Sequence, residues 1–456
     1  MAVYVSAAHK SSGKTTVSIG LCAAMAKRGF SVQPFKKGPD YIDPLWLGKA
    51  SRRGCVNLDF FTSTRDEILS TFKTYAAGSD AQLVEGNKGL FDGLSLNGCD
   101  SNAAMAKLLG MPVVLVIDAQ GMTRGVAPLL LGYQQFDSEL AIAGVIFNRV
   151  GGERHEAKLI SAAREYTDIP VLGAVRKFRR SSIKEKHLGL IPANEDASAT
   201  RKIEDLGRLM EEGVDVVRVA ELATGQPPGS PALTPSANHD RPAADLKIGI
   251  ARDAAFGFYY YDDLQAFERE GVELTPFSPI TDQALPEVDA LFLGGGFPER
   301  HLSELEANQG MRAAIRAAIE QGMPVYAECG GMMYLAREIS WQGRVGEGVG
   351  AIPARVVMSS SPQGRGYMQL RETGLGRWPG GDPKRLINAH EFHYSRLTDL
   401  PEGMTYAYDV IRGKGIENGK DGIVYKNLLA SYGHLRDQKQ NHWVKRFVAF
   451  VRGLRT

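Results

Sequence analysis

The sequence predicts an α/β protein of two domains, and three features carry that prediction. Short apolar segments alternate with helix-like segments through the first half of the chain, as in a mostly parallel sheet with right-handed crossovers. Residues 223–245 are rich in Pro, Gly, Ser and Ala, which is typical of a linker. A fresh apolar strand then opens at Leu246 and begins a second α/β pattern. We therefore predict domains at 1–222 and 246–456, joined by a linker at 223–245.

Length and charge narrow the class of protein. A chain of 456 residues is long enough for two or three domains. The net charge of +2 gives no field suited to nucleic acid or an anionic membrane, and no apolar stretch is long enough to span a bilayer. Four cysteines lack metal-type spacing, and the first residues resemble no signal peptide. We expect a cytoplasmic, reduced protein that acts on neither nucleic acid nor membrane, with homodimerisation left open.

The first motif is a phosphate-binding loop. Residues 2–8 form an apolar strand, and an amphipathic segment ending at Gly29 follows the intervening loop. Strand, loop and helix are the context in which backbone N–H groups hold phosphate oxygens. In such a loop Lys14 neutralises phosphate charge and the Thr15 hydroxyl faces Mg²⁺; an ordinary turn containing Gly-Lys-Thr is the alternative. The predicted nucleotide-binding residues are Ser12, Gly13, Lys14, Thr15 and Thr16.

Acidic side chains follow two of the next strands. The further strands are predicted at Ser31–Phe35, Gln82–Val84, Val113–Ile117, Ile142–Phe147 and Pro170–Val175. Ligands of parallel sheets lie at the carboxyl ends of strands, where Asp40, Asp43, Glu85 and Asp92 occur. Mg²⁺ takes one or two carboxylates together with phosphate and water, so we predict a metal set of Thr15, Asp43 and Glu85. The other acids would serve substrate or turns, and a turn is the alternative for Asp92 beside Gly93. Asp118 and Asn148-Arg149 also follow strands and are further candidates to face the nucleotide.

The second domain contains a predicted nucleophile elbow at Cys329. An apolar strand precedes Cys329, Gly330 and Gly331 follow it, and a helix then begins. A thiol near a helix N-terminus is favoured as thiolate, and His434 is the best candidate for its proton partner. The alternative is a buried inert cysteine.

A glycine-rich strand end adds to this site. Backbone N–H groups of Gly295 and Gly296 would form an oxyanion hole. The order of glycine loop, Cys elbow and late His resembles class I glutamine amidotransferases. That family usually carries a carboxylate two residues after the His, where this chain has Arg436. The sequence therefore resembles the subgroup that works with a Cys–His pair alone.

A polar cluster at 388–395 offers other readings. His390 and His393 flank Glu391, but no third ligand at metal spacing is evident, so substrate binding or a domain contact is favoured over a metal. Either histidine competes with His434 as the partner of Cys329. We favour His434 because the family resemblance places the base in the last α/β unit.

The two halves together resemble the cobyrinic acid a,c-diamide synthase family, and the first half also resembles dethiobiotin synthetase, whose phosphate loop likewise lacks the usual first glycine. The segments that carry the family resemblance are Ser12–Thr16, Gln33–Lys36, Gly38–Asp43, Glu85-Gly86, Gly89–Gly93, Asn148–Val150, His187–Leu190, Gly294–Glu299, Glu328–Gly331 and His390–Ser395.

This resemblance implies a P-loop NTPase-like parallel-sheet domain followed by a class I glutamine amidotransferase domain. It implies a C–N ligase that uses ATP·Mg²⁺ to convert tetrapyrrole carboxylates into acyl phosphates. Cys329 and His434 would release ammonia from glutamine through a thioester. The residues implied for the substrate and acyl phosphate are Asp40, Tyr41, Asp43, Lys88 and Asp92.

The chain departs from the family pattern at one place that concerns the choice of substrate. Family members that act on corrins usually have two apolar residues where this chain has Asn87-Lys88. Lys88 would pair with a further substrate carboxylate or with phosphate, or be merely solvated. The macrocycle is left open between cobyrinate and sirohaem types. The competing hypotheses are a dethiobiotin-type ligase, a non-catalytic nucleotide switch and a cobyric acid synthase.

Overall fold

The computed structural model describes residues 2–177, 185–186, 189–224 and 242–455. The chain divides into two compact units, Met1–Asn238 and His239–Thr456, and each is described by itself. Most of the predicted linker, 223–245, lies outside the described residues, as do His187 and Leu188. Helix α8 ends at Thr224 and strand β10 begins at Leu246.

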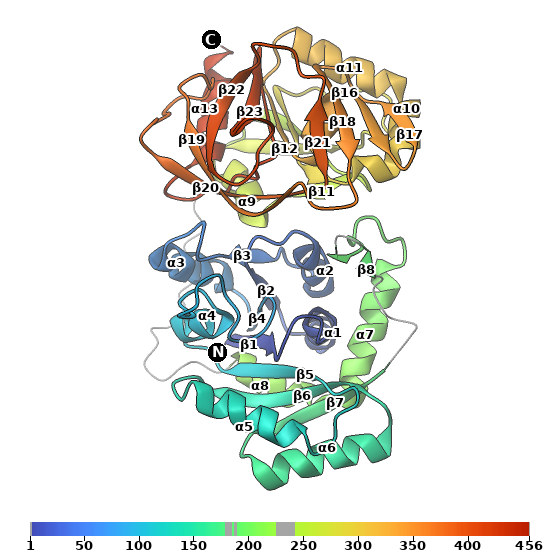
Figure 1. Cartoon of the computed structure of the whole chain (residues 1–456), viewed down its shortest axis with the longest axis vertical. Helices are drawn as coiled ribbons and strands as arrows, with labels where there is room; N and C mark the ends of the chain where they lie inside the picture. Colours follow the sequence, from blue (N-terminus) through green and yellow to red (C-terminus); the bar gives the residue numbers. More distant parts are fainter. Residues whose placement is uncertain (1, 178–184, 187–188, 225–241, 456) are drawn as a thin grey trace. The chain divides into compact units, whose positions relative to one another are not determined.

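The first unit contains a seven-stranded parallel sheet in the order β3-β2-β4-β1-β5-β6-β7 (Figure 1). The six strands expected from apolar segments are present, which confirms the predicted parallel α/β class; the three-residue strand β3 was missed because it is so short. The strands are β1 (Ala2–Ala7), β2 (Val32–Lys37), β3 (Val56–Leu58), β4 (Ala81–Glu85), β5 (Val113–Asp118), β6 (Ile142–Val150) and β7 (Val171–Arg176), with a small pair β8 (Glu185–Lys186) and β9 (Gly189–Leu190).

Helices cover both faces of this sheet. Along β1, Val3 and Val5 pack in one core cluster with residues of α1 and α7, whereas the hydroxyl of Tyr4 donates to Asn102 of α4. Because side chains of a strand alternate between faces, β1 is buried on both sides, as expected in a parallel sheet. The helices are α1 (Lys14–Lys27), α2 (Ile42–Ser51), α3 (Arg65–Ala76), α4 (Asn102–Leu109), α5 (Val126–Phe136), α6 (Glu153–Tyr166), α7 (Ala199–Gly213) and α8 (Val216–Thr224).

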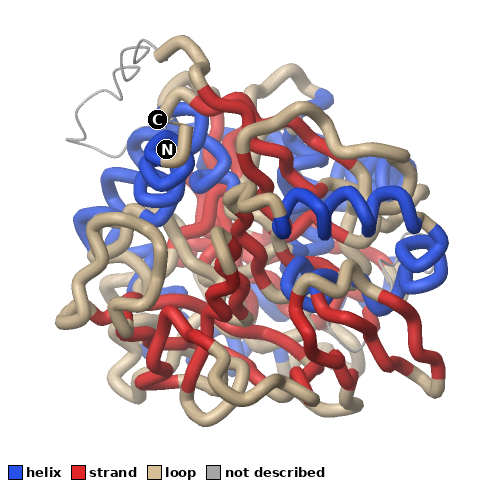
Figure 2. Tube along the Cα trace, turned by 90° about the horizontal axis from the view of Figure 1, so that it is seen from above, coloured by secondary structure: helices blue, strands red, loops and turns tan. Residues whose placement is uncertain are grey.

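The second unit is built on a nine-stranded mixed sheet in the order β12-β10-β13-β15-β24-β23-β22-β19-β20. Figure 2 shows the strands of the chain in red and its helices in blue. The first five strands are parallel and the remainder pair antiparallel. A four-stranded sheet, β17-β16-β18-β21, and the pair β11-β14 accompany it. The α/β pattern was therefore right for this unit, but its large antiparallel part was not foreseen.

The elements of the second unit follow in chain order. The strands are β10 (Leu246–Ala251), β11 (Phe256–Phe258), β12 (Val272–Phe277), β13 (Ala290–Leu293), β14 (Gly295–Gly296), β15 (Val325–Glu328), β16 (Ala336–Trp341), β17 (Arg344–Glu347), β18 (Ile352–Met358), β19 (Gly364–Glu372), β20 (Leu386–His393), β21 (Ser395–Thr398), β22 (Thr405–Arg412), β23 (Lys420–Tyr425) and β24 (Leu428–Ser431). The helices are α9 (Tyr261–Arg269), the 3₁₀ turn η1 (Pro298–His301), α10 (Leu302–Ala307), α11 (Gln309–Glu320), α12 (Gly330–Leu335) and α13 (Trp443–Gly453).

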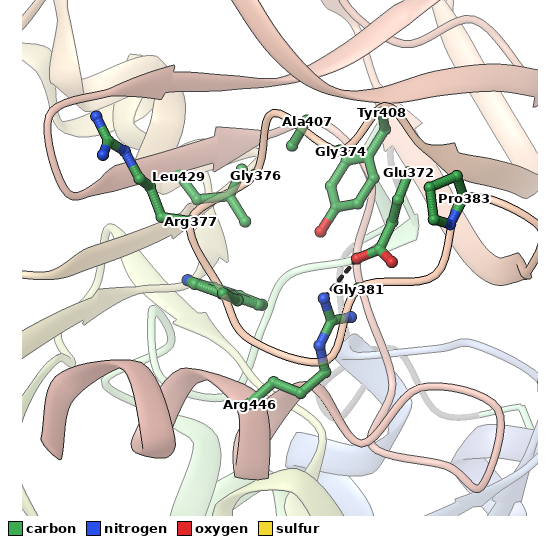
Figure 3. A pocket seen from close by; sticks show the side chains of 11 residues that line it. Glu372, Gly374, Gly376, Arg377, Gly381, Pro383, Ala407, Tyr408, Leu429 and Arg446 are labelled. Atoms are coloured by element: carbon green, nitrogen blue, oxygen red, sulfur yellow. Dashed lines mark hydrogen bonds and ion pairs between the residues drawn. The ribbon is translucent and has the colours of Figure 1, made fainter. Parts of the chain in front are cut away.

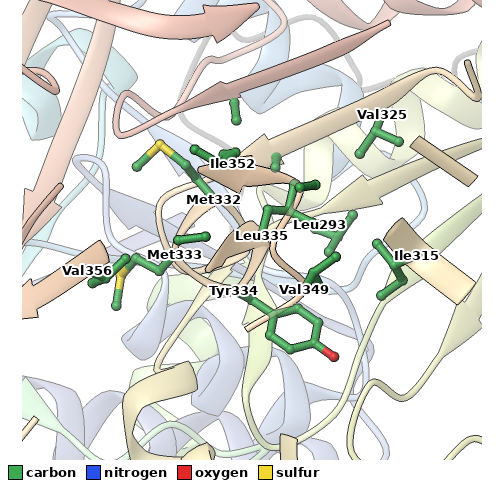
Figure 4. Packing of buried hydrophobic residues seen from close by; sticks show 14 of the residues in the cluster. Leu293, Ile315, Val325, Met332, Met333, Tyr334, Leu335, Val349, Ile352 and Val356 are labelled. Atoms are coloured by element: carbon green, nitrogen blue, oxygen red, sulfur yellow. The ribbon is translucent and has the colours of Figure 1, made fainter. Parts of the chain in front are cut away.

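Helix α12 is buried along its whole length. Met332, Met333 and Leu335 pack in a cluster with Leu293 of β13 and Val325 of β15 (Figure 4). A short helix that is apolar all round is held by its surroundings rather than by its own propensity. The hydrophobic core therefore also fixes the position of Cys329, the residue that precedes α12.

Within the described residues, every helix is too short or too polar to cross a membrane.

Candidate active sites

The phosphate-binding loop closes around Gly13. This residue caps α1 at φ +88°, a conformation that favours glycine. The amide Nδ2 of Asn148, at the end of β6, donates to the Ser12 carbonyl at 2.9 Å. A Cβ at position 13 would lie 2.0 Å from Asn148 Nδ2, so the loop also requires glycine on steric grounds. Lys14 opens α1 with its side chain buried, and Thr15 and Thr16 follow in the first turn.

The three residues predicted for the metal meet beside this loop. The Thr15 hydroxyl lies 2.7 Å from Glu85 Oε1 and 3.2 Å from Asp43 Oδ2. Parallel pairing explains the meeting, since Glu85 ends β4, which lies next to β1. Among the described residues Glu85 Oε2 is buried without a hydrogen-bond partner, so it is an acceptor suited to a cation.

Lys36 was not among the predicted site residues, and it is the centre of the cluster. Its Nζ lies 2.6 Å from Asp43 Oδ2 and 3.0 Å from Glu85 Oε1. Burial by itself lowers the pKa of Lys36, but the surrounding carboxylates raise it well above its usual value. The sequence feature that could have identified Lys36 is a charged residue near the end of an apolar strand. Burial and the nearby Lys36 charge lower the pKa of Lys14.

The other predicted residues of this unit differ in their placement. Asp40 lies 4.0 Å from Lys36 Nζ, and its Oδ1 accepts from the backbone N–H groups of Ile42 and Asp43. Tyr41 is buried beside it. Asp92 Oδ2 accepts from the backbone N–H of Gly89 at 2.9 Å, so this acid stabilises its own turn.

Two residues at the ends of the neighbouring strands β5 and β6 bind each other. Asp118 and Arg149 form an ion pair at 2.5 Å. Lys88 is exposed and has φ +44°.

Within the described residues, no group of three His, Cys, Asp or Glu side chains is arranged as a metal site. A cation near Glu85 would therefore take part of its ligands from phosphate and water.

In the second unit Cys329 lies on a sharp turn between β15 and α12. Its backbone has φ +44° and ψ −102°, a strained conformation for a residue with a Cβ. The Cys329 backbone N–H donates to the Ser431 carbonyl of β24 at 2.8 Å. Parallel pairing with β24 and the buried α12 hold the strain, which is the geometry expected of a nucleophile elbow.

Cys329 Sγ lies 3.9 Å from the Phe392 carbonyl, to which the thiol donates, and Cys329 also hydrogen-bonds His434. Burial lowers the pKa of His434, but the hydrogen bonds to Cys329 and Glu328 outweigh burial and raise it to about 10. Of the rival histidines, His393 has its Nδ1 2.8 Å from the Ser395 carbonyl. His390 lies beside His434, with ring centroids 6.5 Å apart, and burial lowers the pKa of His390 to about 3.

Glu328 supplies a third residue that the sequence comparison with class I enzymes did not lead us to expect. Its Oε2 lies 3.1 Å from His434 Nδ1. The predicted Cys–His pair therefore has a carboxylate beside its imidazole, from a position other than residue 436. Arg436 is itself buried, pairs with Asp262 and lies over the Tyr260 ring.

The predicted oxyanion glycines lie against the same site. A Cβ on Gly295 would come within 2.8 Å of His434 Cε1. A Cβ on Gly330, the residue after the cysteine, would come within 2.7 Å of Gly296 N. Gly330 therefore lets its own backbone meet that of Gly296, and Gly295 leaves room for the imidazole of His434.

A separate cavity of about 210 Å³ in this unit lies beside the Glu372–Arg446 ion pair (Figure 3). Trp378 and Tyr408 also line it, and none of the predicted site residues does.

Comparisons with known proteins assign a domain type to each half of the chain. Residues 5–191 match the family model described as the CobQ/CobB/MinD/ParA nucleotide binding domain, and residues 247–441 match the CobB/CobQ-like glutamine amidotransferase domain. The chain is 44% identical to the cobyrinate a,c-diamide synthase of Magnetococcus marinus, with 99% of this chain and 97% of that protein covered. It is 38% identical to the protein of the same name from Methanosarcina acetivorans, over 95% of this chain and 92% of that one. For the protein of that name from Listeria innocua the identity is 37%, over 95% of each chain. The chain belongs to the cobyrinate a,c-diamide synthase family, whose members are glutamine-dependent amidating ligases with a nucleotide-binding domain and a glutamine amidotransferase domain.

Proposed function

We propose that this protein amidates the a and c acetate carboxylates of cobyrinate, with ATP to activate each carboxylate and glutamine to supply ammonia. The observation that carries the proposal is that one chain holds both halves of such a reaction. The first unit has a phosphate loop beside Thr15, Asp43 and Glu85, and the second has a cysteine paired with His434. The relatives that carry the name of this activity match over nearly their whole length.

In the first unit the reaction is phosphoryl transfer. Backbone N–H groups of Ser12–Thr16 and the ammonium of Lys14 would hold the phosphates of ATP. Thr15, Asp43 and Glu85 would hold Mg²⁺, which supplies positive charge beside the phosphates. An acetate oxygen attacks the γ-phosphorus, ADP leaves, and an acyl phosphate forms. The buried ammonium of Lys36 offsets negative charge on the transferred group, because no water screens it there.

The acceptor carboxylate must approach the same strand ends. Asp40, Tyr41 and Asp43 lie on the loop and first turn that lead into α2, next to Lys36. We assign these residues to orientation of the substrate. Asp92 and Lys88 stay weaker candidates, because Asp92 stabilises its own turn and Lys88 is exposed.

In the second unit the reaction is hydrolysis of the glutamine side-chain amide. His434 takes the thiol proton of Cys329, and the thiolate attacks the amide carbon. Backbone N–H groups at Gly295 and Gly296 would stabilise the oxyanion. The protonated His434 gives its proton to the leaving nitrogen, ammonia departs, and water then hydrolyses the thioester to glutamate.

Ammonia completes the reaction by attacking the acyl phosphate and displacing phosphate. It must arrive as neutral NH₃, because its protonated form has no lone pair to attack with. We assign the two reactions to domains at 1–222 and 246–456, joined by the linker at 223–245.

A product assay tests the proposal. The full chain is incubated with ATP·Mg²⁺, glutamine and, separately, cobyrinate, sirohydrochlorin or sirohaem, and products are identified by mass spectrometry. Each amidation replaces OH by NH₂ and lowers the mass by about 1 Da. Two successive shifts with cobyrinate are expected. Product from sirohaem alone would overturn the substrate and assign Asn87-Lys88 as specificity residues, whereas glutamine hydrolysis without any amidated product would overturn the acceptor class.

A further inference from the structure

The glutaminase site has a carboxylate in an unexpected place. Glu328 is the last residue of β15, directly before Cys329, and its side chain is buried. Strand β15 pairs in parallel with β24, and Glu328 lies opposite Ser431. The chain continues from Ser431 to His434 within three residues, so the strand end that carries the cysteine also lies beside the imidazole.

The two oxygens of Glu328 have separate partners. Oε1 accepts from the hydroxyl of Tyr326 at 2.6 Å and from the backbone N–H of Leu435 at 3.1 Å. Oε2 lies 3.1 Å from His434 Nδ1. Two donors on one oxygen fix the orientation of the carboxylate, and the other oxygen is aimed at the imidazole.

This arrangement selects one tautomer of His434. An ionised carboxylate only accepts hydrogen bonds, so Nδ1 carries its proton toward Glu328. The lone pair of Nε2 then faces the thiol of Cys329, and because the pKa of His434 is raised to about 10, the thiol proton passes to it near neutral pH. The negative charge of Glu328 also stabilises the imidazolium that forms when His434 takes the thiol proton.

We infer that Glu328 is the positioning residue of the glutaminase site: it holds His434 in the proton-accepting tautomer and takes the part of the carboxylate that class I enzymes carry two residues after the His. The inference rests on the proposed glutaminase reaction. Arg436 occupies that later position and pairs with Asp262, so it leaves the imidazole to Glu328.

Glu328→Gln and Glu328→Ala separate a positioning role from a merely structural one. In the Gln variant, Tyr326 and Leu435 still donate, so the amide oxygen faces them and the NH₂ group faces His434 Nδ1. That NH₂ donates and forces the proton onto Nε2, where it blocks acceptance of the thiol proton. In the Ala variant a water can accept from Nδ1.

We therefore expect Glu328→Gln to lower kcat for glutamate release by about 10²-fold with little change in KM, and Glu328→Ala to lower it less. A structural role predicts the reverse order, because Ala leaves a cavity and two unpaired donors, whereas Gln fills the space. The order of the two variants is thus the decisive result, and equal or greater loss in the Ala variant overturns the inference.

A second readout does not depend on turnover. The rate at which iodoacetamide alkylates Cys329 in the full chain is measured between pH 5 and 9. In Glu328→Gln the proton-accepting tautomer is lost, so alkylation near neutral pH should slow by roughly tenfold and the pH profile should move upward. An unchanged profile also overturns the inference.

Glu372→Gln is the matched control. Glu372 is another buried glutamate of the same unit, and it pairs with Arg446 at 2.5 Å beside the separate cavity (Figure 3). Its kcat and alkylation profile should equal those of the wild type. Cys329→Ser tests the underlying reaction: if glutamate release survives that change, the proposed glutaminase is wrong, whereas its loss together with a harmless Glu328→Gln rejects only the role of Glu328.

Discussion

Lys36 Nζ and Glu85 Oε1 lie 3.0 Å apart at the carboxyl ends of the neighbouring strands β2 and β4, and both side chains are buried. A buried ion pair adds little net stability, because removing both charges from water costs about as much as their attraction returns. Losing one partner is far more costly, since it leaves an unpaired buried charge. The pair therefore makes the site sensitive to single substitutions.

Lys36→Met should destabilise the first unit by about 3 kcal/mol at pH 7.5, because Asp43 and Glu85 lose their shared cation. The loss should be smaller at pH 5, where unpaired carboxylates accept protons more readily. Urea unfolding of the full chain at both pH values measures this. Lys107→Met is the control: its partly exposed pair with Asp137 should contribute no more than about 1 kcal/mol. Equal losses in the two variants would show that the Lys36 pair behaves as a surface pair.

Cys329→Ser should stop synthesis with glutamine and leave synthesis with ammonium chloride intact. The hydroxyl of serine is a poor nucleophile next to an imidazole built for a thiol, whereas the first unit needs only ammonia and ATP. Amidated product is measured with each nitrogen source at pH 8.5, where more ammonia is neutral. A parallel loss with both nitrogen sources would mean that the cysteine acts outside glutamine hydrolysis.

The stability of the second unit should depend on pH through His434. In the unfolded chain the pKa of a histidine is near 6.5. In the folded chain burial lowers the pKa of His434, but the hydrogen bonds to Cys329 and Glu328 outweigh burial and raise it to about 10. Between these values the folded state binds the extra proton, so stability falls as pH rises. The contribution is complete below about pH 6.5 and is lost as pH passes through about 10.

Urea unfolding of wild type and His434→Gln between pH 6 and 10 isolates this contribution, since the other titrating groups largely cancel in the difference. The stability difference between the two proteins should shrink as pH rises. A difference that stays constant with pH would show that His434 is neutral in the folded protein.

Gly13→Ala should weaken ATP binding by at least tenfold. The new Cβ would meet Asn148 Nδ2 at 2.0 Å, and φ +88° is strained for alanine. Asn148→Ala removes only the hydrogen bond to Ser12, so its effect should be smaller. The double variant should bind ATP better than the sum of the single losses predicts, because the clash is gone but the backbone strain stays. Isothermal titration with ATP·Mg²⁺ measures the cycle, and strict additivity would contradict the contact between the two residues.

Much of the fold and of both sites was predictable from the sequence. The strands of the first unit are buried on both faces and read as apolar runs, so their type and order along the chain were clear. Thr15, Asp43 and Glu85 were expected together because parallel strands bring their carboxyl ends to one edge. Lys36 was missed because a lysine near the end of an apolar strand indicates a buried charge but does not identify the carboxylates that will surround it.

The sequence by itself determined the residues that lie in local patterns: the glycine and lysine of the phosphate loop, the cysteine between strand and helix, and the α/β class of each half. Tertiary structure alone decided which distant groups meet. Glu328 reaches His434 only because β15 and β24 pair in parallel with Glu328 opposite Ser431. Strand register is set by long-range packing, and a shift of one residue turns every side chain to the other face. For that reason the third residue of the Cys329 site could not be found from sequence spacing.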